Sequence, residues 1–276
     1  MAEWQVDAGL RWRALQPFGV EIDQDLAAPL TAAQSARFVE LLWANGLLLA
    51  RGQHLGMERQ RELCALAGPI LLRAGESGYL SNAGGAEPSL SELRWHADAA
   101  YTEAPFDCLS LHAIDVVDEA SSTCFMNAAD ACDALPAALR RRLAALQVEM
   151  IAPGYESLAL RTCDKRDPVA QKRGVRPAIV RNPHNGRDCV WVSEMQSARV
   201  LGISWEDSRA LLHEIYTHLY RPTAVFEHRW RSGDFILWDN IALQHMRGSL
   251  RSVGRRVLQR VIVGTDGVAP HVALDA

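Results

Sequence analysis

The stretch Trp95-His96-Ala97-Asp98 is the most informative in the sequence, because it places a histidine and a carboxylate two residues apart. Side chains alternate with period two along an extended strand, so His96 and Asp98 are predicted to share one face. Such a pair can hold a metal ion from one side only. The third ligand is expected from His245, which ends the stretch Leu237-Trp238-Asp239-Asn240-Ile241-Ala242-Leu243-Gln244-His245. Because His245 lies far along the chain, only a closed β-structure would bring the three side chains together.

Two histidines and one carboxylate form the facial triad of non-heme Fe(II) oxygenases, which leaves coordination positions open for a co-substrate and O2. The same three residue types also suit Zn2+, so a metal-dependent hydrolase is an alternative. A third interpretation is a β-barrel binding module without catalysis, in which the histidines are structural. The residues around the triad therefore have to discriminate among these classes.

Composition places the chain among ordinary globular proteins. Its 276 residues are 49% hydrophobic and 22% charged, which is enough for one large β-rich domain or two small ones. The net charge of −4 gives no general attraction to nucleic acid or to an anionic membrane. No apolar run reaches the roughly 18–20 residues that span a bilayer, and Met1-Ala2-Glu3-Trp4 does not open a signal peptide. A cytoplasmic location is therefore expected.

The six cysteines are scattered through apolar contexts and form no CxxC pair. This pattern favours reduced, mostly buried thiols over a disulfide framework or a zinc site. The six are Cys64, Cys108, Cys124, Cys132, Cys163 and Cys189.

The hydrophobic pattern predicts a β-rich core with helices packed outside it, as one domain over residues 1–276. One helix is expected to begin at the cap Thr31, with Gln34 completing a capping box, and to end at Asn45-Gly46. Other helices are expected over residues 57–66, 128–146 and 205–219, the last of them capped by Ser204. Strands are expected over residues 17–23, 47–50, 105–117, 189–192, 225–230, 233–238 and 257–263. A hairpin turn is expected at Asn185-Gly186, and Gly233-Asp234 is expected to turn between two paired strands. Residues 73–94 are predicted to be a loop beside the metal motif, which could act as a lid, and residues 153–176 a polar insertion.

Two arginines follow His245. If residues 257–263 form a strand, Arg256 and Arg260 share one face. A guanidinium can pair bidentately with a carboxylate. A dicarboxylate co-substrate such as 2-oxoglutarate needs this arrangement, because its keto-acid end chelates iron while its far carboxylate must be clamped.

Taken together, these stretches resemble the Fe(II)/2-oxoglutarate-dependent dioxygenases of the taurine dioxygenase (TauD/TfdA) type over most of the chain. The matching pieces are Phe18-Gly19-Val20-Glu21-Ile22, the segment from Asn45 to Gln53, Trp95-His96-Ala97-Asp98, the segment from Gly233 to His245, and Arg256. The resemblance implies a mainly β fold with surrounding helices and a double-stranded β-helix, or jelly-roll, core. It implies an oxidoreductase that uses Fe(II), 2-oxoglutarate and O2.

The resemblance also implies roles for individual residues. His96, Asp98 and His245 would hold Fe(II), and Arg256 and Thr123 would bind 2-oxoglutarate; for Thr123 an ordinary strand threonine is the alternative. Arg260 matches an arginine that contacts the substrate sulfonate in taurine dioxygenase, or that supports the arginine before it. The implied reaction is hydroxylation of an unactivated C–H bond of a small organic substrate, giving succinate and CO2. Desaturation, demethylation and ring formation stay open.

Several positions depart from the family pattern. Glu92 stands where taurine dioxygenase has a substrate-contacting asparagine. A carboxylate beside an anionic sulfonate would be repulsive, which argues against taurine; Glu92 could instead meet an amine or face solvent. Gln196 replaces a pocket phenylalanine, and Ser121-Ser122 replaces a Gly-Gly pair. Further substrate contacts are expected from Asn82 and Tyr101. Halogenating relatives lack the carboxylate ligand, so Asp98 favours oxygen transfer or desaturation. The family is often oligomeric, which allows a homo-oligomer, although no stretch of the sequence marks an interface.

Overall fold

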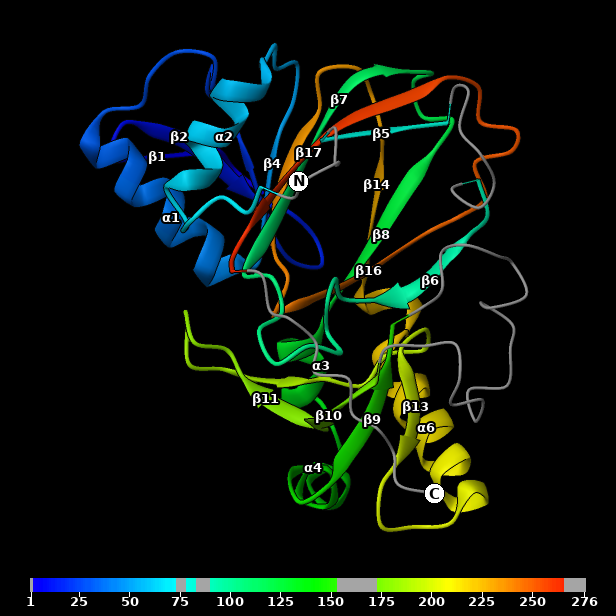
Figure 1. Cartoon of the computed structure of the whole chain (residues 1–276). Coiled ribbons are helices and arrows are strands. Elements are labelled where there is room, and N and C mark those ends of the chain that lie inside the picture. Colours follow the sequence, from blue (N-terminus) through cyan, green and yellow to red (C-terminus); the bar gives the residue numbers. More distant parts are fainter. Residues whose placement is uncertain (1, 73–77, 83–89, 153–172, 266–276) are drawn as a thin grey trace.

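The computed structural model describes residues 2–72, 78–82, 90–152 and 173–265 (Figure 1). Two sheets form its upper part. The larger sheet has the strand order β1 (Gln5–Asp7), β2 (Leu10–Ala14), β3 (Val20–Ile22), β4 (Leu47–Ala50), β15 (Phe235–Asp239), β7 (Cys108–Val116), β17 (Arg256–Val263) and β5 (Tyr79–Ser81). The smaller sheet has the order β14 (Val225–Arg229), β8 (Ser122–Asn127), β16 (Leu243–Arg247) and β6 (Leu93–His96).

The chain crosses repeatedly between these sheets, from β7 to β8 and from β14 through β15 and β16 to β17. Every pairing within them is antiparallel except that of β3 with β4. Inward side chains of both sheets meet in one buried cluster, to which Leu109, Trp238 and Leu258 contribute from the larger sheet and Phe125 and Leu243 from the smaller. A mainly β fold with a jelly-roll core, as predicted, is confirmed.

Gly233 and Asp234 were expected to turn one strand back onto its predecessor, and this expectation is wrong. β14 pairs with β8, whereas β15 pairs with β4 and β7, so the turn carries the chain from one sheet to the other. Gly233 has a φ of 84°, and a Cβ there would lie 3.1 Å from the backbone N and O of Gln53. Both features require glycine.

Two helices cover the outer face of the larger sheet (Figure 1). α1 (Ala32–Asn45) begins at Thr31, where the predicted capping box with Gln34 is present, and ends at Gly46, whose φ is 77°. α2 (Met57–Ala65) follows β4. Their apolar faces bury residues from both helices and from the sheet, including Phe38, Leu42, Leu63, Leu48, Phe235, Leu237 and Val261. Burial on this face fixes the larger sheet as a rigid base.

The lower part of the molecule lies between β8 and β14 in sequence. It contains α3 (Ala128–Asp133), α4 (Ala137–Ala144), α6 (Trp205–Leu219) and the short helix η1 (Pro222–Ala224). It also contains a sheet in the order β10 (Arg173–Pro177), β9 (Gln147–Ile151), β13 (Ser197–Val200), and the hairpin of β11 (Ile179–Arg181) with β12 (Asp188–Val190). The predicted hairpin turn at Asn185-Gly186 and the helix capped by Ser204 are confirmed.

The single helix expected over residues 128–146 is wrong, because the structure has two helices there. α3 ends at Asp133, and Pro136, which has no N–H to continue a helix, is the N-cap residue of α4. The loop expected over residues 73–94 is also wrong in its described parts, since β5 pairs with β17 and β6 begins at Leu93. Residues 73–77, 83–89 and 153–172 lie outside the described residues, and with them the hypothesis that 73–94 closes as a lid.

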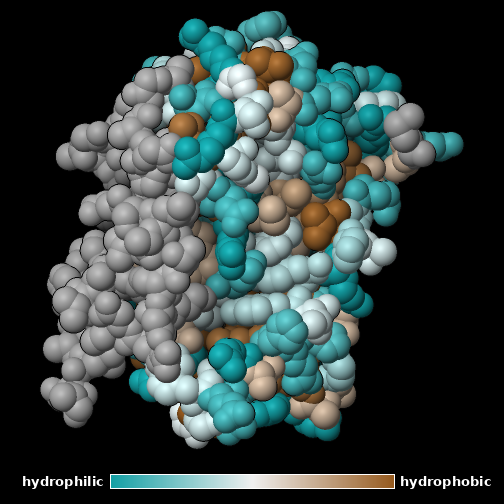
Figure 2. All heavy atoms as spheres, turned by 90° about the vertical axis from the view of Figure 1, so that its right-hand side faces the viewer, coloured by the Kyte–Doolittle hydropathy of each residue, from teal (hydrophilic) through white to brown (hydrophobic). Residues whose placement is uncertain are grey.

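The five described cysteines are free thiols, and all but Cys124 are buried, as the sequence predicted. Cys163 lies outside the described residues. No helix in the described ranges is long and apolar enough to cross a membrane. Seen from the right-hand side of Figure 1, the surface that is not covered by grey atoms is mostly hydrophilic, with hydrophobic atoms in small separate groups (Figure 2).

Candidate metal centre

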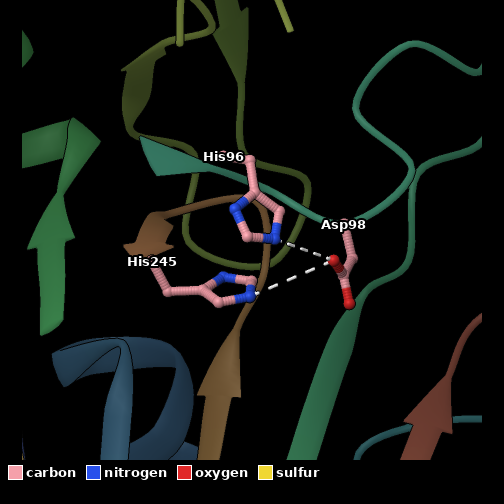
Figure 3. Close-up of side chains that lie close together, drawn as sticks. All are labelled: His96, Asp98 and His245. Atoms are coloured by element: carbon pink, nitrogen blue, oxygen red, sulfur yellow. Dashed lines mark ion pairs between the residues drawn. The ribbon is translucent and has the colours of Figure 1, made fainter. Parts of the chain in front are cut away.

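The structure brings His96, Asp98 and His245 together at the end of β6 (Figure 3). β16 pairs with β6 in the register that sets His245 opposite His96, and the two imidazole ring centres are 4.2 Å apart. The Oδ1 atom of Asp98 lies 3.4 Å from Nε2 of His96 and 4.0 Å from Nε2 of His245. One ligating atom from each residue lies within 4.8 Å of the others, so a single cation could contact all three.

Asp98 reaches this position differently from the prediction. β6 ends at His96, and Asp98 lies in the turn that follows, just before Ala99 with its φ of 57°. The expectation that His96 and Asp98 share a strand face is therefore wrong. The reason is that the backbone N–H and C=O of Asp98 bond to the side chain of Asn240 rather than to a neighbouring strand.

Hydrogen bonds and charges around the three side chains suit a metal ion. Nδ1 of His96 lies 2.7 Å from the carbonyl oxygen of Arg94, which fixes the ring with Nε2 facing Asp98. Burial, followed by the charge of His96, lowers the pKa of His245 to about 3. Burial alone would raise the pKa of Asp98, but the hydrogen bond from His96 and the charges of His245, His96 and Arg260 bring it below its usual range. Neutral imidazoles and an ionised carboxylate are the forms that ligate metals.

Aromatic side chains restrict His245 on the inner side of the smaller sheet. Trp238 meets its ring edge-on at 5.2 Å and Phe125 lies at 6.1 Å. Nδ1 of His245 is buried and has no hydrogen-bond partner among the described residues. Its Nε2 is the atom that points to Asp98 (Figure 3).

Arg256, the first residue of β17, is buried, with only 4% of its surface exposed. Within the described ranges no carboxylate pairs with its guanidinium, and its Nε has no hydrogen-bond partner. The guanidinium carbon lies 5.9 Å from the ring centre of Trp230, whose Nε1 donates to the hydroxyl of Thr123 at 2.9 Å. Burial, followed by the charge of Arg247, lowers the pKa of Arg256 to about 9. A buried cation of this kind favours an anionic ligand.

Arg260 lies on the same inner face of β17 as Arg256, as predicted from the strand period. Its charge contributes to the lowered pKa of Asp98, and its backbone N–H donates to the carbonyl oxygen of Gly78 at 2.6 Å. Arg256 and Arg260 therefore share the inner face of β17.

The remaining predicted substrate contacts are placed as follows. Glu92 is exposed and its carboxylate lies 3.5 Å from Nε of Arg94. Tyr101 is half-buried in the turn after Asp98 and packs against the main core cluster. Both amide atoms of Asn82 bond to backbone around the start of β17, to the O of Gly254 and the N of Arg256. The amide of Gln196 is bonded to Ala97 and Ser193. Both amides are thus occupied by the protein itself.

Sequence reasoning missed two contributors. Trp230 links Thr123 to Arg256, and no spacing in the sequence signals this contact. Asn240 stood inside the quoted stretch before His245, but its bonds to Asp98 span 142 positions and follow only from the tertiary fold.

Comparisons with known proteins agree with this fold. The profile of the family described as "Taurine catabolism dioxygenase TauD, TfdA family" matches residues 11–262. Pentalenolactone F synthase of Streptomyces arenae is 27% identical over 182 residues, which is 62% of this chain and 61% of that protein. The alpha-ketoglutarate-dependent 2,4-dichlorophenoxyacetate dioxygenase of Cupriavidus pinatubonensis is 26% identical over 91% of this chain and 95% of its own. A putative alpha-ketoglutarate-dependent taurine dioxygenase from Burkholderia xenovorans superposes with a TM-score of 0.78 at 21% identity, covering 95% of each chain.

A jelly roll that carries a His-Asp-His cluster is typical of the non-heme dioxygenases. The chain belongs to the TauD/TfdA family within that class. It is an oxidoreductase of the alpha-ketoglutarate-dependent dioxygenase type, whose co-substrates are 2-oxoglutarate and O2. The family resemblance read from the sequence is confirmed.

Proposed function

We propose that the chain binds Fe(II) through His96, Asp98 and His245 and 2-oxoglutarate through Arg256 and Thr123, and that it oxidises a C–H bond of a small organic anion. The observation that carries the proposal is the buried guanidinium of Arg256, which has no carboxylate partner among the described residues and lies on the strand face that also carries Arg260. A Zn2+ hydrolase would give this cation no role. A non-catalytic binding module would not need three metal-ligating side chains that converge on one point.

The donor set fits ferrous iron. Two neutral imidazoles and one carboxylate supply three ligands on one side and leave the other side for a chelating 2-oxoglutarate and O2. When bound, the iron with these co-substrates supplies the oxidising power that C–H cleavage needs, with 2-oxoglutarate leaving as succinate and CO2.

The protein's own residues bind, orient and exclude water. Arg256 would pair with the far carboxylate of 2-oxoglutarate, and burial strengthens that pairing. The hydroxyl of Thr123 accepts the Trp230 N–H, so its own proton is free to be donated to the same carboxylate. Trp238 and Phe125 pack against His245 and keep its imidazole in one orientation. Side chains held in fixed positions keep the reacting groups close together and correctly oriented, which lowers the barrier to reaction.

The substrate class rests on Arg260. Its charge lies near the triad and would attract an anionic group, which could be a carboxylate or a sulfate ester. The 2,4-dichlorophenoxyacetate named for one relative is a carboxylate, which supports this class. Glu92 is exposed and paired with Arg94, so its charge is compensated and does not oppose an anionic substrate. Hydroxylation is the proposed outcome. Another relative is named for making pentalenolactone F, and its likeness keeps ring formation and desaturation as the second candidate.

The test is turnover under defined conditions. Metal-free protein would be loaded anaerobically with Fe(II), given 2-oxoglutarate and O2, and assayed for succinate across a panel of aryloxy carboxylates, sulfate esters, sulfonates and amines. The proposal expects succinate that depends on all three additions and rises with an anionic substrate. Asp98→Ala should abolish it. Activity restored by Zn2+ alone, without O2, would instead support the hydrolase.

A further inference from the structure

The segment that carries Asp98 lies beyond the end of β6 and has no strand partner among the described residues, but side chains hold its backbone. β6 ends at His96, so residues 97 and 98 have no ladder hydrogen bonds. A carboxylate on an unsupported turn could swing away from the two histidines. In this structure two buried amide side chains, from Gln196 and Asn240, take the place of the missing strands.

Gln196 holds Ala97 from one side. Its Nε2 donates to the carbonyl of Ala97 at 2.8 Å, and its Oε1 accepts from the N–H of Ala97 at 3.3 Å. The hydroxyl of Ser193 donates to the same Oε1 at 3.2 Å. Only 2% of Gln196 is exposed. Its neighbour Met195 donates its backbone N–H to the carbonyl of Trp95 at 3.0 Å, so Gln196 extends the pairing along β6 by one residue.

Asn240 holds Asp98 in the same manner. Its Oδ1 accepts from the N–H of Asp98 at 2.9 Å, and its Nδ2 donates to the carbonyl of Asp98 at 2.8 Å and to that of Phe106 at 3.1 Å. The side chain is fully buried. Only this orientation of the amide fits, because a flipped amide would set its donors against the N–H of Asp98.

The two amides hold consecutive residues. Gln196 pairs the N–H and C=O of Ala97, and Asn240 pairs those of Asp98. Neither amide contacts the carboxylate or the imidazoles in any described contact. Their effect on a metal ion would pass through the backbone of residues 97 and 98.

Asn240 also belongs to the turn that leads into β16. The carboxylate of the preceding Asp239 accepts from the backbone N–H groups of Ile241 at 2.8 Å and Ala242 at 3.0 Å, which fixes the chain a few residues before His245. One turn therefore holds both Asp98 and the start of the strand that carries His245. The separation of these two ligands is set at this point.

We propose that Asn240 and Gln196 are positioning residues of the metal centre, which fix Asp98 against His96 and His245 by pairing both polar backbone groups of residues 98 and 97. The inference rests on the proposed function, because it assigns Asp98 as a ligand. It adds two residues that touch neither metal nor substrate. Removing residues that orient the metal ligands has lowered metal affinity by about 10- to 100-fold at other metal sites.

The experiment measures Co(II) binding to the metal-free full-length protein, by calorimetry and by the visible absorption of the bound ion, so that the readout does not depend on turnover. Asn240→Ala and Gln196→Ala should each weaken Co(II) binding by about 10- to 100-fold. Their Co(II) spectra should shift toward that of Asp98→Ala, because the carboxylate no longer keeps its place. The double variant should lose less than the product of the two single losses, since both amides hold one segment.

Gln53→Ala is the matched control. Gln53 is likewise a buried amide that clamps backbone, at the N of Leu26 and the carbonyls of Gln24 and Arg51, but on the loop after β4. Its loss should lower the melting temperature and leave the affinity and spectrum of bound Co(II) unchanged. If an alanine variant fails to fold, Asn240→Asp and Gln196→Glu keep side-chain size and the acceptor while replacing the NH2 donor, and the same shift in spectrum is expected of them.

The outcomes separate the two proposals. If Asp98→Ala binds Co(II) as tightly as the parent protein, the assignment of the metal centre is wrong. If Asp98→Ala loses Co(II) while folded Asn240 and Gln196 variants keep the parent's affinity and spectrum, the metal centre stands and the positioning role is overturned.

Discussion

Replacing Arg256 by methionine tests the co-substrate site most directly. The guanidinium is 4% exposed and has no carboxylate partner among the described residues, so the unliganded protein holds a nearly uncompensated buried charge. Its pKa falls from 12.5 to about 9. At about 1.4 kcal/mol per pH unit, this corresponds to roughly 5 kcal/mol against the charged form, as an order of magnitude. Methionine keeps much of the length and removes the charge.

Two opposite effects are therefore expected of Arg256→Met. Without 2-oxoglutarate the variant should be as stable as the parent protein or more stable, because an unpaired buried charge has been removed. With 2-oxoglutarate it should lose about 2–5 kcal/mol of binding free energy, the cost of truncating one partner of a buried charge pair. That loss is about 30- to 5,000-fold in affinity.

The assay is thermal unfolding of the Co(II)-loaded protein over a titration of 2-oxoglutarate. The parent protein should gain about 2.7 kcal/mol at a hundred times its dissociation constant, and Arg256→Met should gain less than about 1 kcal/mol at that concentration. Arg229→Met is the control, because Arg229 is an exposed arginine on β14 that pairs with Glu227. The reasoning is refuted if Arg256→Met unfolds much earlier than the parent while its melting temperature still rises with 2-oxoglutarate.

Three further predictions concern the scaffold and are checked by denaturant or thermal unfolding. Glu149→Gln should cost about 3–5 kcal/mol, since it removes a buried charge that pairs with Arg173 at 2.9 Å and Arg199 at 2.8 Å; a loss below 1 kcal/mol would contradict this. Gly233→Ala should cost at least about 1–2 kcal/mol, because φ is 84° and the new methyl would lie 3.1 Å from the backbone of Gln53. Thr31→Ala should cost about 1 kcal/mol through the lost cap of α1, whereas Thr31→Ser should be nearly neutral.

The catalytic class was readable because its chemistry is carried by residue types in short motifs. His96, Asp98 and His245 could be named from their types and from the stretches around them, and Arg256 and Arg260 from the strand period. Local signals also predicted α1 with its capping box and the turn at Asn185-Gly186, since both depend on contacts within a few residues. These features need no knowledge of distant partners.

Errors arose where a distant partner decided the local structure. The sequence set His96 and Asp98 on one strand face, but the side chain of Asn240 captures the backbone of Asp98 and turns the chain there. The strand β5 in the expected loop exists because β17 offers it an edge. A propensity taken over a short window of sequence cannot include either distant partner, Asn240 for Asp98 or β17 for β5.

The sequence by itself determined which groups are available for chemistry: three metal-ligating side chains, two arginines on one strand face and a β-rich pattern to carry them. Only the tertiary structure decided how they are held. It placed His245 opposite His96 through strand register, left Arg256 buried without a carboxylate, and clamped residues 97 and 98 between two amides. The physical reason is that residue type fixes the chemistry of a side chain, whereas its orientation and charge environment depend on contacts between segments far apart in the chain.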